Sequence, residues 1–200
     1  MNNKVLLVED IVLEQGDIKL APLTSIHKDG LLEAAKDGEL WELWYTSVPN
    51  KETITSYVDA ALEEKEKKES NPFIVIQKST NKIIGSTRYM NIDRMNRRLE
   101  IGHTWYARSF QRTGANTTCK FLLLQHAFEI LDAVAIEFRT HFFNHKSRAA
   151  IERLGAKQDG ILRNHRIDKN GLLRDTVVYS ILCSEWPVVK KSLQHKLNIN

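Results

Sequence analysis

The stretch Gln111-Arg112-Thr113-Gly114-Ala115-Asn116 lies between a segment that alternates like a strand, 98–106, and a strongly apolar segment, 116–131, with helical spacing. A loop at this junction presents unpaired backbone N–H groups at the positive end of a helix dipole. Such a loop binds phosphate groups, and Gly114 lets the backbone approach them closely. A single glycine is equally typical of a plain strand-to-helix turn, so the spacing leaves both interpretations open. The GxGxxG and P-loop patterns do not occur, which argues against a dinucleotide or a nucleoside triphosphate.

The segments around this loop predict an α/β (α+β) fold. Before the loop we expect strands at 5–8 and 17–20 around a turn at Gly16-Asp17, one or two helices over 24–44, a helix at 53–69, and strands at 73–76, 82–91 and 98–106. After it we expect a helix at 116–131, a strand at 135–140, a helix at 146–154 that ends at Gly155, a hairpin of 160–166 and 172–182, and a helix at 184–197. The crossover from 98–106 to 135–140 makes two neighbouring strands parallel. The sheet is therefore mixed and mostly antiparallel, with flanking helices.

Length and composition favour one ordinary globular unit. The chain has 200 residues, of which 42% are apolar and 27% charged, as expected for a single domain over 1–200. No apolar run approaches the roughly 20 residues of a membrane span, and residues 1–7 lack the core of a signal peptide. Cys119 and Cys183 are far apart, so neither a disulfide framework nor a cysteine-rich zinc site is expected. We therefore expect a cytoplasmic protein with no membrane contact.

The net charge of +4 is compatible with nucleic acid or with a polyanionic cofactor. Basic residues gather in two short clusters: Arg94, Arg97 and Arg98, and then Arg163, His165 and Arg166. Both are short enough to be solvated turns, and no stripe of alternating aromatic and basic residues accompanies them. Binding of nucleic acid is therefore disfavoured. The histidines show no metal-ligand spacing with carboxylates, so no metal site is expected.

Three motifs in order resemble one family. Gln111-x-x-Gly114-x-Asn116 resembles the Q/R-x-x-G-x-G/A pyrophosphate loop of the GNAT N-acetyltransferases, with Asn116 in place of the last small residue. Glu100-Ile101-Gly102-His103 is similar to the Glu-Ile-Gly strand of the ribosomal-protein N-terminal acetyltransferase branch. Asn144-x-x-Ser147, followed by Leu154-Gly155-Ala156, resembles that branch's Asn-x-x-Ser…Leu-Gly-Phe motif. The resemblance covers about 73–182, and 1–72 match more loosely as the acceptor side.

The resemblance implies a GNAT-type sheet whose parallel strands splay apart, with acetyl-CoA as co-substrate and no metal. The thioester is expected in the gap between Trp105 and Ile136. The residues it assigns to the cofactor are Trp105 on the strand that pairs with pantetheine, the loop residues Gln111, Arg112, Thr113, Gly114, Ala115, Asn116 and Thr117, and also Asn144 and Arg148. Arg148 is expected to reach a CoA phosphate, and Asn144 the pantetheine arm.

Two residues are catalytic candidates. Glu100 is a general base for the amine, because an ammonium group must lose its proton before the nitrogen can attack a thioester. The alternative for Glu100 is a cross-strand ion pair with an arginine of the basic turn. Ser147 is an acid or anchor for the leaving thiolate, and its alternative is a hydroxyl that caps the following helix. Many GNAT enzymes have a tyrosine acid seven positions after the asparagine, where this chain has Ile151.

The resemblance implies an N-acetyltransferase that acts by direct transfer in a ternary complex, because Cys119 reads as a buried helix residue. The acceptor is a primary amine, either a protein N-terminus or a small molecule, and the oligomeric state is monomer or homodimer. Trp41 and Tyr45, with Trp44 beside them, are candidates for a wall of the acceptor pocket or for plain core packing. The rival hypotheses are a non-catalytic acyl-CoA sensor of the same fold and, less favoured, a basic nucleic-acid-binding domain.

Overall fold

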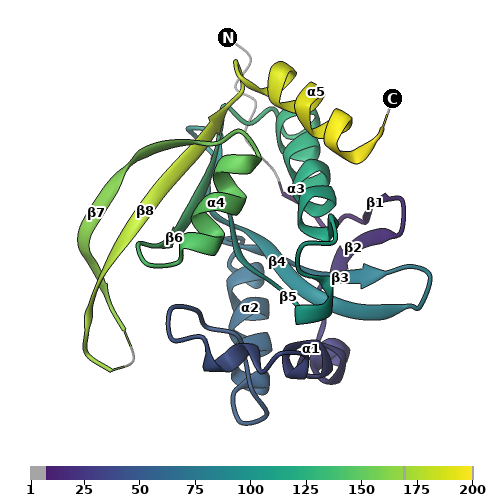
Figure 1. Ribbon diagram of the computed structural model, residues 1–200, viewed down its shortest axis with the longest axis vertical. Coiled ribbons are helices and arrows are strands. Elements are labelled where there is room, and N and C mark those ends of the chain that lie inside the picture. Colours follow the sequence, from purple (N-terminus) through teal and green to yellow (C-terminus); the bar gives the residue numbers. More distant parts are fainter. Residues whose placement is uncertain (1–7, 169, 200) are drawn as a thin grey trace.

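The computed structural model describes residues 8–168 and 170–199, which form one eight-stranded sheet in the order β1-β2-β3-β4-β5-β6-β8-β7 (Figure 1). Neighbouring strands are antiparallel except β5 and β6, which are parallel. The predicted mixed sheet with one parallel pair is therefore confirmed. The strand expected at 5–8 lies outside the described residues apart from Val8, and so does Lys169 in the turn of the last hairpin.

The part of the chain before residue 70 gives two short strands and two main helices. These elements are β1 (Leu13–Gln15), β2 (Ile18–Pro22), a 3-10 turn (Ser25–His27), α1 (Lys28–Lys36), a second 3-10 turn (Leu40–Glu42) and α2 (Ile54–Glu66). The turn at Gly16-Asp17 is confirmed, and it joins β1 to β2. Of the one or two helices expected over 24–44, α1 is the α-helix present, with a 3-10 turn on either side. It ends at Lys36, because Gly38 has a φ of 97°, which a right-handed helix does not allow.

The rest of the chain follows the predicted order closely. Its elements are β3 (Asn71–Gln77), β4 (Lys82–Asp93), β5 (Arg98–Tyr106), a 3-10 turn (Arg108–Phe110), α3 (Ala115–Gln125), a π-helical turn (His126–Ile130), β6 (Ala135–His141), α4 (His145–Arg153), β7 (Lys157–Ile167), β8 (Leu173–Leu182) and α5 (Trp186–Leu197). Gly155 has a φ of 103° just after α4, as expected for a helix terminator. No helix among the described residues is long and apolar enough to cross a membrane.

The parallel pair is short, and this shortness shapes the centre of the molecule. β5 and β6 pair through three register positions only, the last of which joins Glu100 to Glu137. Beyond it the two strands separate. Ile136 lies opposite Leu99 within the paired part and is fully buried, so the expectation of a gap between Trp105 and Ile136 is wrong on the β6 side. The opening lies instead between 101–106 of β5 and 138–141 of β6.

The two faces of the sheet carry separate cores. On one face, here called the α3 face, Leu123 of α3, Leu193 of α5 and Ile151 of α4 pack against the sheet. On the other, the α2 face, Leu31 of α1 and Val58 of α2 pack over β3 to β5. Figure 1 shows α1 and α2 below the sheet and α3 and α5 above it, with the long β7–β8 hairpin standing out on the left. β7 is exposed along most of its length, so the α2 face is open over this hairpin.

A bulge in β5 decides which side chains share a face. His103 and Thr104 lie together opposite Thr87 of β4, and His103 has a φ of 46°. The extra residue inverts the alternation of side chains along the strand. Glu100 before the bulge and Trp105 after it therefore lie on the same, α2, face. By alternation and pairing, this face also presents Arg88 and Met90 of β4, Arg139 and His141 of β6, Arg174 and Thr176 of β8, and Arg166 of β7.

Candidate active site

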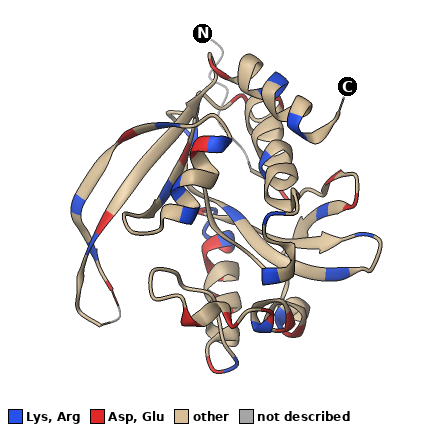
Figure 2. Ribbon diagram, viewed as in Figure 1, with Lys and Arg blue, Asp and Glu red and all other residues tan. Residues whose placement is uncertain are grey.

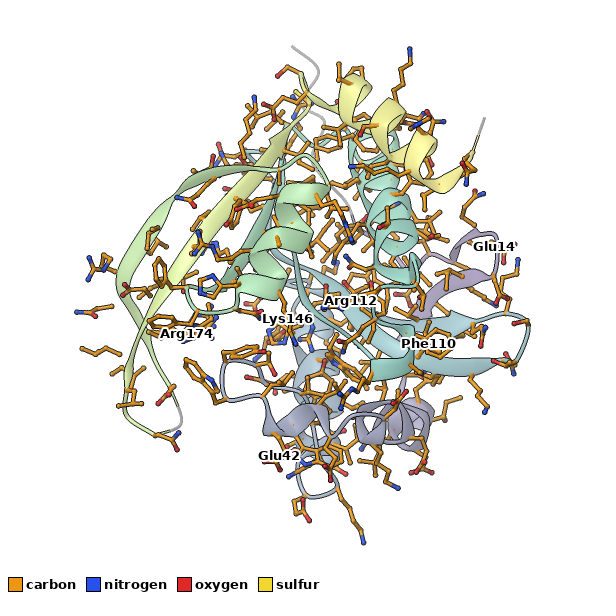
Figure 3. All side chains as sticks on the ribbon, in the orientation of Figure 1. Glu14, Glu42, Phe110, Arg112, Lys146 and Arg174 are labelled. Atoms are coloured by element: carbon orange, nitrogen blue, oxygen red, sulfur yellow. The ribbon has the colours of Figure 1, made fainter. Side chains whose placement is uncertain are left out.

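Six successive backbone N–H groups, those of residues 112–117, donate no hydrogen bond within the described part of the chain. These residues, here called the amide loop, form the end of the β5–α3 connection and the first turn of α3. Arg112 and Gly114 have φ angles of 65° and 93°, and left-handed residues of this kind turn neighbouring amides toward one concavity. Free amides at a helix N-terminus bind anions. The prediction that this segment could hold phosphate thus has a structural basis (Figure 3).

Side chains before and within the amide loop hold it in place. Gln111 donates from Nε2 to the carbonyl oxygen of Tyr106 at 3.1 Å, and the Thr113 hydroxyl donates to the carbonyl oxygen of Phe110 at 2.8 Å. Both bonds tie the loop back to the end of β5. The loop is therefore held by its own side chains, whereas its backbone amides stay free for a ligand.

A second anchor comes from the N-terminal part of the chain. Asp37, just after α1, accepts from the backbone N–H of Ser109 at 3.0 Å and from the Ser109 hydroxyl. These bonds lower the pKa of Asp37 below its ordinary value, so the carboxylate stays charged. Within the loop, a Cβ added to Gly114 would have no other atom within 4 Å. The connection that carries the amide loop is thus anchored by Asp37, and the space next to Gly114 is open.

The separated edges of β5 and β6 lie next to this loop. Residues 101–106 and 138–141 have no ladder partner on the sides where the two strands face each other. Their backbone groups can therefore pair with an extended ligand that carries amide groups, as in the addition of a strand to a sheet edge. Arg112, just before α3, and Lys146, in the first turn of α4, both lie near the centre of the view in Figure 3.

Asn144 and Ser147 lie at the start of α4. Asn144 is the N-cap, and its Oδ1 accepts from the backbone N–H of Ser147 at 3.0 Å. The alternative in which the Ser147 hydroxyl caps the helix is therefore wrong, because Asn144 supplies the cap. The half-buried Ser147 hydroxyl makes no hydrogen bond within the described residues. It is free to meet a ligand at the mouth of the opening.

Arg148 is held mainly against the protein. Its Nε donates to the Tyr179 hydroxyl at 3.1 Å and its Nη1 to the carbonyl oxygen of Phe142 at 3.4 Å. The guanidinium carbon lies 5.2 Å from the centre of the Phe142 ring. Tyr179 in turn donates to Glu152 at 2.9 Å. Both N–H groups of Nη2 and one of Nη1 of Arg148 are left for the phosphate contact that the family resemblance implies. Ile151, one turn further along α4, is buried in the core.

Glu100 lies where β5 and β6 separate, and the residue is only 6% exposed. Its Oε2 accepts from Asn91 Nδ2 at 2.7 Å and lies 3.6 Å from Arg139 Nε. Burial raises the pKa of Glu100 above its ordinary value, although the bond from Asn91 and the charge of Arg139 oppose the rise. The alternative of an ion pair with the basic turn is wrong, since Arg98 pairs with Glu137 at 2.6 Å.

Gly102 makes the space that Glu100 occupies. A Cβ on Gly102 would lie 2.5 Å from Met90 Sδ and 3.0 Å from Glu100 Oε1. Trp105 lies further along the same face and donates from Nε1 to the Tyr57 hydroxyl of α2 at 3.1 Å. Its side chain is therefore part of the core on the α2 face, and only its backbone borders the opening.

Aromatic side chains cross the opening on the α2 face. The exposed Trp44 lies edge-on to His141 at 4.9 Å between ring centres and 6.3 Å from Phe143, both near the end of β6. Tyr45 lies 5.5 Å from Trp44, whereas Trp41 packs against the core under α1. Of the three early aromatics, Trp44 reaches the opening most directly. Nothing local in the sequence links residue 44 to residue 141, so His141 and Phe143 were missed.

Other features do not compete with this opening. Hollows of about 600 and 310 Å3 lie beside the β4–β5 turn and near the end of α2. Asn91, which donates to Glu100, lines the first, but neither Glu100 nor the amide loop lines either hollow. Cys119 is buried, which raises the pKa of its thiol to about 11, so it is a poor nucleophile at neutral pH. Among the described residues, no three His, Cys, Asp or Glu side chains are grouped to hold a metal ion. Lys and Arg are interspersed with Asp and Glu over helices and strands (Figure 2).

Known proteins share this geometry. Residues 17–157 match the family described as acetyltransferase (GNAT) domain. YdaF of Bacillus subtilis (strain 168), provisionally named a ribosomal N-acetyltransferase, is 36% identical over 104 residues, which are 52% of this chain and 56% of YdaF. A GCN5-related N-acetyltransferase from Brucella melitensis is 31% identical over 94% of this chain and 86% of its own, with a TM-score of 0.83. The microcin C7 self-immunity acetyltransferase MccE, solved with acetyl-CoA and AMP, shares the fold at a TM-score of 0.73 and 21% identity over 84% and 93% of the two chains.

An open parallel strand pair with a phosphate-type loop at its side defines an acyltransferase of the GNAT class. The chain belongs to the GNAT acetyltransferase family, and the family supports acetyl transfer as its chemistry. The predicted resemblance to this family and to its ribosomal-protein branch is therefore confirmed. The match to YdaF spans little more than half of that protein.

Proposed function

We propose that this chain is an acetyl-CoA-dependent N-acetyltransferase that acetylates a primary amine by direct attack in a ternary complex. The observation that carries the proposal is the row of free backbone amides at 112–117 beside the opening between β5 and β6. A diphosphate needs several N–H donors at one place, and an arm with amide groups needs a free strand edge. This chain offers both next to each other.

The residues present fit acetyl-CoA. The amide loop would hold the diphosphate, the free edges at 101–106 and 138–141 would pair with the pantetheine amides, and Nδ2 of Asn144 would donate to the same arm. Arg148 would contribute Nη2 to a phosphate. When bound, acetyl-CoA supplies an acetyl group activated as a thioester. The MccE complex shows that a protein of this fold binds acetyl-CoA.

Glu100 is the proposed base. A primary amine is mostly protonated at neutral pH, because alkyl amines titrate near 10.4 and α-amines near 8. Glu100 accepts the proton, directly or through one water, and the freed nitrogen lone pair forms the new N–C bond as the C–S bond breaks. Burial raises the pKa of Glu100 and so makes the carboxylate a stronger base. The space that Gly102 leaves keeps the carboxylate over the opening.

Ser147 is the proposed donor to the departing sulfur. Its hydroxyl has no partner among the described residues and lies in the first turn of α4, at the mouth of the opening. A thiolate leaving group needs such help only modestly, since thiols titrate near 8.5. The aromatic cluster of Trp44, Tyr45, His141 and Phe143 is proposed as the wall against which the acceptor packs.

The proposal is tested with purified protein, acetyl-CoA and a panel of primary amines, including peptides with free N-termini. Released CoA is measured by thiol detection and the acetylated amine by mass spectrometry. Transfer to at least one amine, together with a higher melting temperature in acetyl-CoA, is expected. A rise in melting temperature with no transfer would favour a sensor. No response to acetyl-CoA at all would contradict the proposal.

A further inference from the structure

Two arginines face each other on the last hairpin without an acidic partner. Arg166 of β7 lies directly opposite Arg174 of β8, and neither forms an ion pair with a described residue. The Nε of Arg174 is buried and donates no hydrogen bond. By contrast, Arg163 of the same hairpin pairs with Asp175 at 2.7 Å. Like charges at directly opposite positions destabilise a hairpin, and a buried donor without an acceptor adds to the cost. The arginine pair, Arg166 and Arg174, is thus poorly explained by stability.

The arginine pair lies on the α2 face, the same face as Glu100. Thr176, the next residue on that face after Arg174, lies opposite His141 of the aromatic cluster. The charge of Arg166 is near enough to Glu100 to lower the pKa of that carboxyl, and the charge of Arg174 likewise lowers the pKa of His141. Figure 3 places Arg174 between the hairpin and the rest of the molecule.

Arg88 and His103 approach the same space from β4 and β5. Arg88 is buried; it pairs through Nη1 with Glu64 of α2, and its Nε has no acceptor. His103 is exposed to solvent as a residue, although protein atoms crowd one side of it. Desolvation by that protein and the charges of Arg88 and the arginine pair hold the pKa of His103 at about 4. The ring is therefore neutral at pH 7, and the positive charge of this region comes from arginine.

We propose that the acceptor amine carries its own anionic group, a carboxylate or a phosphate, which the arginine pair binds. The inference rests on the transferase function proposed above and names its substrate class. Guanidinium groups bind planar carboxylates and phosphates through two parallel hydrogen bonds. Such a ligand neutralises the like charges of the pair and gives Arg174 Nε an acceptor. The amine of the same molecule then lies toward Glu100, which takes its proton.

The position of the pair distinguishes this ligand from the phosphates of CoA. The amide loop begins α3, which packs on the opposite face of the sheet, whereas the arginine pair faces the side of α2 and Trp44. A peptide N-terminus without a nearby acidic group would leave the positive charges of Arg166 and Arg174 unneutralised. A small amine with an anionic group is therefore the favoured acceptor.

The test measures kcat/KM by thiol release for two matched amine pairs, serine with serinamide and phosphoethanolamine with ethanolamine. Wild type is expected to prefer the anionic member of at least one pair. Arg166→Gln and Arg174→Gln should each reduce that preference, the ratio of the two kcat/KM values, at least about tenfold. Comparing ratios between proteins cancels the different basicities of the amines. The amine pair whose anionic preference falls more shows whether the arginines bind a carboxylate or a phosphate. Arg163→Gln is the control that should keep the preference. Equal ratios in wild type and both variants would overturn the proposal.

A second measurement does not depend on turnover. Inorganic phosphate is titrated into protein saturated with CoA, and its Kd is taken from the shift in melting temperature. Phosphate should stabilise wild type and Arg163→Gln but not Arg174→Gln. Identical responses would contradict anion binding by the pair, and a clear fall in the melting temperature of ligand-free Arg174→Gln would contradict it too, by making Arg174 structural. If phosphate binds as expected while no amine is acetylated, the transferase fails and the anion site stands.

Discussion

Glu100 and Glu137 lie opposite each other as the last register pair of β5 and β6, yet their pKa values shift in opposite directions. Burial raises the pKa of Glu100. Burial also acts to raise the pKa of Glu137, but hydrogen bonds from Arg139 and Arg98 outweigh it and lower the pKa. Two carboxylates with divergent pKa values have different chemical roles. Glu100 is the one fitted to accept a proton, and Glu137 is the one held as an ion-pair partner.

Glu100→Gln tests this division of roles. The substitution keeps the shape and removes the proton acceptor, so turnover should fall by roughly 10²–10⁴ while acetyl-CoA affinity stays the same. Gly102→Ala should also lower turnover, because the added Cβ displaces the carboxylate. Unchanged turnover of Glu100→Gln near neutral pH would remove Glu100 as the base.

The same variant has a signature in stability. Because the folded-state pKa of Glu100 lies above its ordinary 4.5, the charged form is disfavoured in the fold and costs stability at neutral pH. Glu100→Gln should therefore raise the melting temperature at pH 7, and the gain should shrink as the pH falls toward 4.5. A melting temperature lower than wild type at pH 7 would show instead that the carboxylate stabilises the fold.

Lys120 of α3 gives an independent prediction. Among the described residues, its buried Nζ has only the hydroxyls of Thr104, at 2.6 Å, and Thr87, at 3.3 Å, as partners, and burial lowers its pKa to about 7 from 10.5. Between these pH values the unfolded chain binds a proton that the folded chain does not. Stability should therefore rise with pH from about 7 to about 10.5. Lys120→Met should remove this rise, with its largest gain in melting temperature below pH 7. The exposed Lys82→Met is the control, and an equal pH profile for both variants would exclude a neutral Lys120.

At the start of α4, substitutions of Asn144 and Ser147 should distinguish a capping role from a catalytic role. Asn144→Ala removes the N-cap and should cost about 1 kcal/mol of stability. Ser147→Ala should leave the melting temperature unchanged, because its hydroxyl bonds no described residue, and should lower turnover more at high pH, where less external acid is available. Melting temperature and turnover are measured on one preparation of each protein. Normal turnover of Ser147→Ala across the pH range would remove Ser147 from the mechanism.

Local periodicity predicted most of the fold. The strands after residue 70 and the helix α4 were predictable because their patterns are strong and their ends carry turn residues such as Gly155. In 24–44 the pattern does not separate one helix from two, because apolar spacing continues past Lys36 and hides the break at Gly38. The short strand β1 was missed because three residues carry too little pattern.

The candidate site was predictable only in its local parts. The amide loop and Asn144 are marked by neighbouring residues, whereas the grouping of Glu100 with Arg166 and Arg174 depends on the pairing of β5, β6, β8 and β7. Its grouping with Trp105 depends on the bulge at His103. The bulge inverts the faces of β5, and alternation alone cannot reveal it. Contacts between distant segments, such as Trp44 with His141, arise from the packing of the whole chain.

The amide loop carries the central claim, and its affinity for the diphosphate of CoA tests it most directly. Kd is measured by calorimetry for CoA and for pantetheine, which lacks the diphosphate, with wild type and Gly114→Val. Gly171→Val is the control, because Gly171 has a similar positive φ, 81°, and open space at its Cβ but lies in the distant hairpin turn. Gly114→Val should weaken CoA binding at least tenfold, about 1.4 kcal/mol, and leave pantetheine binding unchanged. Equal affinity of a folded Gly114→Val for CoA would contradict the account.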